Sequence, residues 1–198
     1  MQGVSGLVTT HEIHRLAAIA SKTLVASFSS DFVEPEPPVQ LAAETGGVVV
    51  RFFSLQEGAS ERLVERGCLA WYRGVVDRES AVISAAVEAA RRDMRYPPIE
   101  REELPLLMVE VSVLGPWRAL ETLDGFDLRS EALFMDHPLG TVMMQPSLAV
   151  DGNWTLQQLL EALCQKEGLS RGAWADAGVR FRAAPAVWVR EAVVSAAD

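Results

Sequence analysis

The chain has 198 residues, of which 49% are hydrophobic, 23% charged and 7% aromatic, a composition typical of a globular protein. It carries 18 Lys and Arg against 27 Asp and Glu, and the resulting net charge of -9 disfavours nonspecific binding to nucleic-acid phosphates. Two cysteines and the absence of a signal-peptide pattern over residues 1–10 predict a cytoplasmic protein without a disulfide scaffold. The apolar runs are far shorter than the ~20 residues of a spanning helix, so no membrane segment is predicted.

The first forty residues predict one helix followed by a loop. Thr9 and Glu12 have the spacing of a capping box, and apolar residues with helical period follow them. Residues 31–38 contain Pro35, Pro37 and Pro38, which neither propagate a helix nor donate to a strand ladder. This proline-rich stretch is therefore predicted to be a loop.

Two strands and a second helix are predicted next. Residues 48–53 and 68–72 are rich in β-branched and aromatic side chains, and the polar stretch 56–66 between them is predicted to be a long excursion. Asp77 is a good N-cap, and the alanine-rich stripe that follows it predicts a helix packed closely on a sheet. Pro97 and Pro98 prevent that helix from continuing.

The second half of the chain alternates short strands with one clear helix. Residues 107–114 have the period of a strand, which places Glu110 and Ser112 on one face. Residues 132–135 and 141–145 predict a hairpin with a turn over 136–140, and residues 186–190 predict a closing strand. Residues 154–168 predict a helix with a capping box and a glycine stop, whose buried stripe is Leu156, Leu159, Leu160, Leu163 and Cys164.

Strands and helices are interspersed without regular βαβ alternation. We therefore predict an α+β fold with a mostly antiparallel sheet and flanking helices.

Four motifs in order resemble the AMMECR-domain family, which in prokaryotes is protein A of the AmmeMemoRadiSam grouping. The motifs are Arg66-Gly67-Cys68-Leu69, Asp93 to Pro98, Glu102-Glu103-Leu104 leading into Val109 to Leu114, and Trp154 before Leu159 to Leu169 and Trp174. The resemblance covers about residues 10–192, so residues 1–198 are expected to form a single domain of this family. Two positions depart from the family pattern: Ala70 follows Leu69 where the family has a glycine, and Gln145 alone is kept from a Leu-Pro-Gln-Val motif.

The resemblance implies a fold of the RAGNYA type, with two unequal lobes around a cleft. It implies that the cleft binds a small molecule, a nucleotide or a peptide. It also implies that the protein functions together with Memo-type and radical-SAM partner proteins in a modification or biosynthetic pathway. The family brings no settled reaction.

The same motifs suggest site residues. Arg66, Gly67 and Cys68 are expected to border the principal cleft, with Glu110 on the adjacent strand and Gln145 from the hairpin. In this hypothesis Arg66 holds an anionic group, Gly67 lets a ligand approach the backbone and Gln145 forms a hydrogen bond. Arg95 is a second candidate for an anion, or it fixes the turn after the second helix together with Asp93.

Cys68 and Glu110 are the candidate catalytic residues. Cys68 beside an arginine is either a nucleophile or a small apolar residue of a buried strand. Glu110 among valines is either a general base or an ion-pair partner of Arg95, Arg66 or backbone amides. The alternative functions are thus an enzyme that uses Cys68 with Glu110 or His137 in proton transfer, and a regulatory protein-interaction module.

No metal or organic cofactor is predicted. His11 and His14 are three residues apart on one helix face, but no third ligand is close in the sequence, and zinc sites need three or four. The phosphate-binding loops and the zinc-protease motif are also missing from the sequence.

Overall fold

The computed structural model describes residues 7–40, 46–56 and 62–194, and these fall into two compact units. The larger unit holds the described residues up to Leu114 together with residues 187–194, and the smaller unit holds Gly115–Ala186. The last strand, β7 (Arg180–Ala192), contributes its first half to the smaller unit and its second half to the larger. The structure confirms an α+β fold with antiparallel strands.

The sheet of the larger unit has the strand order β2, β1, β3 and then the second half of β7. These strands are β1 (Gly47–Gln56), β2 (Arg62–Trp71) and β3 (Leu107–Leu114). β1 pairs with β2 and with β3 in antiparallel register. The pairing with β2 shifts between Phe52 and Phe53, so that Arg66 is an extra residue without a partner on β1.

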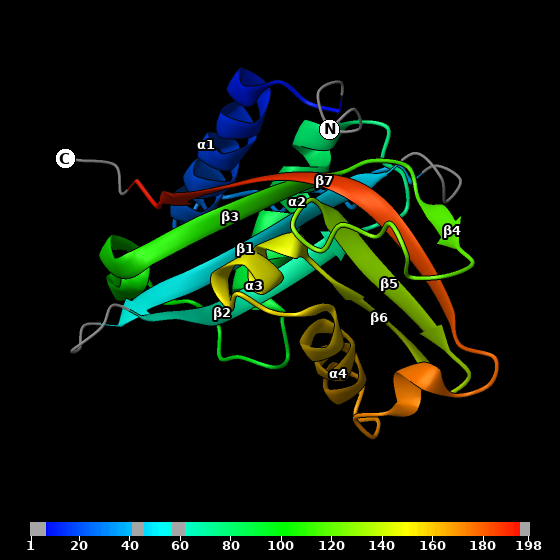
Figure 1. Ribbon diagram of the computed structural model, residues 1–198. Helices are drawn as coiled ribbons and strands as arrows, with labels where there is room; N and C mark the ends of the chain where they lie inside the picture. Colours follow the sequence, from blue (N-terminus) through cyan, green and yellow to red (C-terminus); the bar gives the residue numbers. More distant parts are fainter. Residues whose placement is uncertain (1–6, 41–45, 57–61, 195–198) are drawn as a thin grey trace. The chain divides into compact units, whose positions relative to one another are not determined.

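Two helices cover one face of this sheet, α1 (Thr10–Ala26) and α2 (Arg78–Arg91) (Figure 1). The capping signals predicted both starts: Thr9 accepts a hydrogen bond from the backbone of Glu12, and Asp77 accepts from the backbones of Glu79 and Ser80. The apolar faces of the helices and the inward side chains of β1 and β3 form one buried cluster. The 3-10 helix η1 (Arg101–Leu106) precedes β3.

In the smaller unit β7 lies between β4 (Arg118–Leu120) and β5 (Glu131–His137), and β5 pairs with β6 (Gly140–Met144). The helices are α3 (Pro146–Asp151) and α4 (Leu156–Lys166), and the 3-10 helix η2 (Ala173–Ala175) follows. This unit has its own buried cluster, which joins α4 to β5 and β6.

Helix α4 confirms the prediction for residues 154–168 in its main features. Thr155 and Gln158 form the reciprocal capping box, and Gly168 ends the helix with a φ of 73°, a backbone angle that favours glycine. Leu159, Leu160, Leu163 and Cys164 are buried as predicted, whereas Leu156 is only half-buried.

The predicted excursion over 56–66 is wrong in the part that the structure describes. β1 runs to Gln56 and β2 already begins at Arg62, so the two strands form a longer ladder; residues 57–61, including Gly58, lie outside the described residues. The polar side chains that suggested a loop find partners on the sheet instead, since Glu65 binds Arg51 of β1. Ion pairs between neighbouring strands thus stabilise a strand where the polar sequence alone suggested a loop.

The hairpin of the smaller unit is confirmed, but its turn is tighter than predicted. Asp136 pairs with Thr141 and His137 with Gly140, which leaves Pro138 and Leu139 as the turn. β6 ends at Met144, and Gln145 is the N-cap of α3, a short helix that the sequence did not predict. β4 was also missed, and β7 begins six residues before the predicted strand over 186–190.

Among the described helices, none is both long and apolar enough to cross a bilayer. Both cysteines are free thiols.

Candidate functional site

The second face of the larger sheet carries charged side chains. In the register of β1, Arg51 lies opposite Cys68 on β2 and opposite Glu110 on β3. Residues directly opposite in a sheet project from the same face, so these three side chains belong to one group. Val50 and Phe52, the neighbours of Arg51, project into the helix-covered core. We call this second face the Cys68 face.

A buried ion cluster occupies the Cys68 face. The carboxylate of Glu110 accepts from Nη1 of Arg51 at 3.1 Å and, through its other oxygen, from Nη2 of Arg190 on β7 at 2.5 Å. Glu110 is 0% exposed and Arg51 2%. Both guanidinium groups also lie over the ring of Phe53, 4.5 and 4.7 Å from its centre. Charges buried this deeply need such partners, which explains why Glu110 interrupts a run of valines.

The cluster continues towards the surface through Glu65. Its Oε2 accepts from Nη2 of Arg51 at 2.5 Å, and its Oε1 accepts from the Tyr96 hydroxyl at 3.2 Å. Burial alone would lower the pKa of Arg51, but the charges of Glu110, Glu65 and Cys68 together raise it. Burial, with the charge of Glu65, raises the pKa of Tyr96, so its phenol stays a neutral donor.

Cys68 is half-buried at the edge of this cluster. Its backbone N–H donates to Oδ2 of Asp93 at 2.9 Å. Asp93 in turn accepts from Nε and Nη2 of Arg95 at 2.9 and 2.6 Å. These hydrogen bonds are the main cause that raises the pKa of Arg95, and the charges of Asp93, Glu65 and Cys68 contribute. Cys68 therefore lies opposite the buried Arg51 in the sheet and shares the Asp93 carboxylate with the exposed Arg95.

Arg66 makes a different ion pair from those weighed in the sequence. Its Nε and Nη2 donate to the two carboxylate oxygens of Glu103 at 2.8 and 2.9 Å. The expectation that Arg66 or Arg95 neutralises Glu110 is wrong, because Arg51 and Arg190 bind that carboxylate. Arg66 is the extra residue of a bulge, and all three of its guanidinium nitrogens have acceptors, since Nη1 donates to the Pro97 carbonyl at 3.5 Å.

Gly67 is explained by packing between β2 and α2. A Cβ atom at this position would lie 1.9 Å from the carbonyl oxygen of Ala89, a backbone atom of α2. The alanine-rich face of α2 therefore reaches the strand because residue 67 has no side chain. This contact accounts for the glycine without a ligand, and a ligand approach at Gly67 stays a prediction.

Replacing Gly67 with alanine is expected to lower the free energy of unfolding by about 1–3 kcal/mol, because α2 or β2 must shift to make room. Urea unfolding followed by circular dichroism measures this change. Gly172 is the matched control, since a Cβ there meets no atom within 4 Å. A Gly67→Ala variant as stable as the control would contradict the packing explanation.

Asp93 predicts a pH dependence of stability. Burial opposes ionisation of this carboxyl, but the hydrogen bonds from Arg95 and from the Cys68 backbone outweigh it and lower the pKa of Asp93. Its stabilising contribution is then complete above the unfolded pKa of about 3.9 and disappears as the pH falls through the lower folded value.

Asp93→Asn is accordingly expected to cost about 1–3 kcal/mol at neutral pH. The difference from the parent should narrow below about pH 4. Urea unfolding across the acid range measures both quantities, and a difference that does not change with pH would contradict the role of the charge.

Gln145 and His137 belong to the smaller unit, so their predicted proximity to Cys68 stays a prediction. Gln145 is 4% exposed, and its Oε1 has no hydrogen-bond partner within the described residues. The side chain of His137 is 5% exposed, with Nε2 3.4 Å from the carboxylate of Asp176.

The described residues contain no group of three or more His, Cys, Asp or Glu side chains arranged for a metal ion. Nδ1 of His14 instead lies 2.5 Å from Oε1 of Glu191. The prediction of no metal or cofactor stays a prediction.

The sequence interpretation missed Arg51 and Arg190. Arg51 is the one charged residue within Val48–Phe53, just as Glu110 is the one charged residue within Val109–Leu114. The same signal that singled out Glu110 therefore applied to Arg51. Arg190 had the weaker signal of a charged residue near the end of the last strand.

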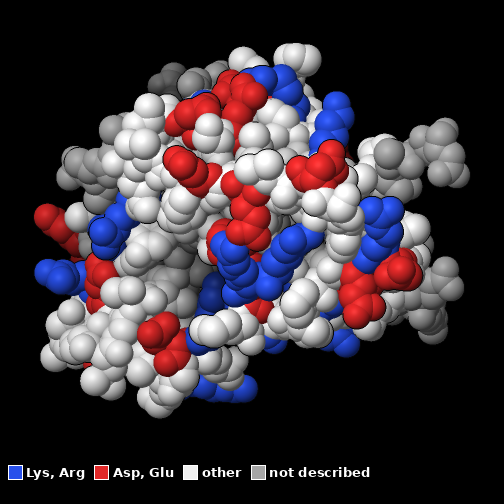
Figure 2. All heavy atoms as spheres, turned by 180° about the vertical axis from the view of Figure 1, so that it is seen from behind, with Lys and Arg blue, Asp and Glu red and all other residues white. Residues whose placement is uncertain are grey.

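Figure 2 shows the face of the molecule opposite to the view of Figure 1, and there basic and acidic side chains lie next to one another. Ion pairs also connect α1 to α2, namely Arg15 with Glu79 and Arg78 with Glu12.

Comparisons with known proteins identify the family. A protein of Aeropyrum pernix is 34% identical over 161 residues, which cover 75% of this chain and 69% of that protein. A protein of Thermofilum pendens is 32% identical over 121 residues, which span 57% of its length. The crystal structure of the uncharacterized protein PH0010 from Pyrococcus horikoshii has the same fold, with a TM-score of 0.74, 23% identity and 93% of each chain covered. The AMMECR1 family model matches residues 17–184, nearly the whole chain, and the chain therefore belongs to the AMMECR1 family.

Proposed function

We propose that the protein binds a small molecule or peptide with an acidic group at the Cys68 face, where Arg95 binds the acidic group and Cys68 contacts the ligand. One observation carries the proposal: Oδ2 of Asp93 accepts from both the Cys68 backbone and Nη2 of Arg95, which places the half-buried Cys68 beside an exposed guanidinium group. The side chain of Arg95 is 47% exposed. Its Nη1 makes no hydrogen bond with the described residues, so it offers a donor to an anion.

The surroundings of Arg95 support a site with a fixed shape. Asp93 holds the guanidinium through two hydrogen bonds and holds the Cys68 backbone through a third. Glu65, whose Oε1 lies 3.4 Å from Nη2 of Arg95, connects this guanidinium group to Arg51 of the buried ion cluster. Side chains held by such a network lose little conformational freedom when a ligand binds.

The alternative of an enzyme with Glu110 as the base has less support. Both oxygens of Glu110 accept hydrogen bonds from arginines, and the side chain is 0% exposed. A general base must instead reach the proton that it removes. The other interpretation of Glu110, a structural ion-pair partner, agrees with these contacts.

Further features stay proposals that derive from the family resemblance. These are a ligand cleft between two lobes, a hydrogen bond from Gln145, Memo-type and radical-SAM partners, and a cytoplasmic location.

Alkylation of Cys68 tests the proposed site. Its thiolate sulfur forms a bond to the methylene carbon of iodoacetate or iodoacetamide, and iodide leaves. The exposed guanidinium group of Arg95 should attract the anionic reagent and so raise its reaction rate relative to that of the neutral reagent. We expect the rate ratio of iodoacetate to iodoacetamide at Cys68 to exceed that of N-acetylcysteine by about fivefold. Mass spectrometry of peptides separates Cys68 from Cys164.

The Arg95→Ala variant should lower this ratio towards that of the free thiol. Arg15→Ala is the matched control, because its side chain is 48% exposed and lies on α1. An equal ratio in the parent and in Arg95→Ala would overturn the anion site. A Cys68 that reacts with neither reagent until the protein is unfolded would overturn the ligand contact.

A further inference from the structure

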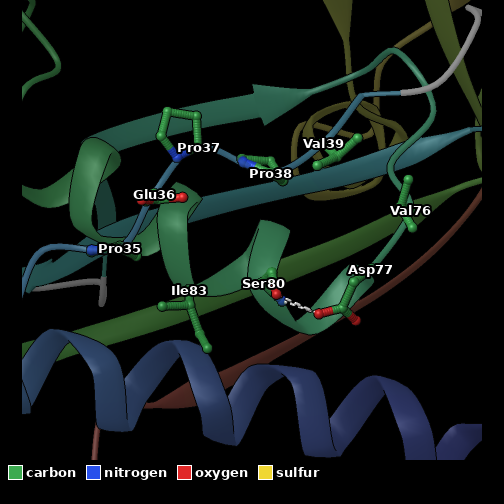
Figure 3. A pocket seen from close by; sticks show the side chains of 9 residues that line it. All are labelled: Pro35, Glu36, Pro37, Pro38, Val39, Val76, Asp77, Ser80 and Ile83. Carbon is green, nitrogen blue, oxygen red and sulfur yellow. Dashed lines mark hydrogen bonds between the residues drawn. The ribbon is translucent and has the colours of Figure 1, made fainter.

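The larger unit has a cavity that shares no residue with the Cys68 face. It measures about 340 Å³ and lies between the proline-rich segment and the start of α2 (Figure 3). Its walls are mostly apolar, and the residues that line it are Pro35, Glu36, Pro37, Pro38, Val39, Val76, Asp77, Ser80 and Ile83. Cavities of this size accommodate one large side chain or a small ligand.

The proline-rich wall of the cavity is anchored at both ends. At one end the Val76 N–H donates to the Val39 carbonyl at 3.1 Å, and Gln40 pairs with Val75 in an isolated antiparallel bridge. At the other end Glu34 forms an ion pair of 2.5 Å with Arg92. The backbone contacts of Val39 and Gln40 hold this wall in place, and prolines restrict the backbone before them, so the wall does not depend on a bound partner.

Two valines at the edge of the cavity are exposed side by side. Val39 is 71% exposed and Val76 61%, and the hydrogen bond between their backbones holds them together. Adjacent exposed apolar side chains beside a concave surface are typical of protein-binding sites.

Carboxylates lie at both ends of the cavity. Figure 3 shows Glu36 on the proline-rich segment at one end, and Asp77 next to Val76 at the other. Hydrogen bonds from the Ser80 side chain, and then from its backbone, lower the pKa of Asp77, so this group is ionised at neutral pH. Glu36 is exposed and takes part in none of the ion pairs among the described residues. An occupant that is apolar at its centre and positively charged at its ends complements this arrangement.

We propose that the cavity docks an extended segment of a partner protein in which an apolar side chain is flanked by lysine or arginine. The apolar side chain enters between Pro37 and Ile83 and covers Val39 and Val76. The flanking cations pair with Glu36 and Asp77. This proposal does not depend on the Cys68 site, since no residue is shared.

A peptide titration of the full chain, followed by the backbone amide signals in NMR, tests the proposal. The probe is acetyl-Lys-Leu-Lys-Leu-Lys-amide. One comparison peptide replaces each lysine with glutamate, and another replaces each leucine with serine. We expect saturable shifts at Val39, Val76 and Ser80 with the first peptide and binding at least about tenfold weaker with the other two.

Val76→Ser and Glu36→Gln should each weaken binding of the first peptide by about threefold to tenfold. Val33→Ser and Glu102→Gln are the controls: Val33 is 84% exposed on the same segment, Glu102 is an exposed carboxylate, and neither lines the cavity. Control variants that lose as much affinity would overturn the proposal. Equal binding of either comparison peptide, shifts that map elsewhere, or no saturable shift up to about 5 mM peptide would also overturn it.

Discussion

Replacing Glu110 with alanine is expected to lower the free energy of unfolding by about 3–5 kcal/mol, because the change leaves buried cations without their shared carboxylate. Arg51 is 2% exposed and would keep its ion pair with Glu65. Arg190 loses the oxygen that it binds at 2.5 Å. The two guanidinium groups, which both lie over Phe53, would then lack the carboxylate that binds them both.

Urea unfolding measures the effect, with Glu34→Ala as the matched control. Glu34 also pairs with an arginine at 2.5 Å, but both side chains are 51% exposed, so the control should change stability by less than about 1 kcal/mol. A double-mutant cycle of Arg51 and Glu110 isolates the coupling between them. A Glu110→Ala variant no less stable than Glu34→Ala would refute the anchoring role.

The helix starts could be predicted because their signals are local. Thr9, Asp77 and Thr155 each cap a helix with a side chain that bonds to a backbone N–H two or three residues further along. Such contacts depend on a few consecutive residues, which the sequence displays in full. α3 was missed because Gln145, its N-cap residue, makes no capping hydrogen bond with its side chain.

The strand ends could not be predicted because tertiary partners decide them. Arg62 to Arg66 contains three charged side chains and resembles a loop, yet Glu65 and Arg66 are satisfied by Arg51 and Glu103. The first part of β7 contains Pro185, which weakens a strand prediction. The Pro185 carbonyl nevertheless accepts from the Gly115 N–H at 2.7 Å.

The sequence predicted which residues belong to the candidate site better than it predicted their contacts. A carboxylate among valines indicated that Glu110 needs a partner, but the register of β1 against β3 determines that the partner is Arg51. The family motif drew attention to Gly67, but a motif does not distinguish a glycine needed for a ligand from one needed for helix packing. Only the 1.9 Å approach of a hypothetical Cβ to Ala89 makes that distinction.

Leu163→Ala is expected to lower the free energy of unfolding by about 2–5 kcal/mol, because it removes a fully buried side chain from a core that cannot collapse around the gap. Leu163 is 0% exposed and belongs to the cluster that joins α4 to Leu133 and Met135 of β5. Trp154 and Trp174 pack against this cluster, so tryptophan fluorescence during urea unfolding reports on it.

The control for Leu163 is Gln157→Ala on the exposed side of α4, which should change stability by less than about 0.5 kcal/mol. The buried clusters of the two units share no residue. The space left by the Leu163 side chain should therefore first loosen the smaller unit, which contains it. Amide hydrogen exchange should therefore accelerate in β5 and β6 more than in β1 and β3. Equal acceleration of exchange in all four strands would show instead that the two units open together. A Leu163→Ala variant within about 1 kcal/mol of the parent's stability would contradict the rigid core around Leu163.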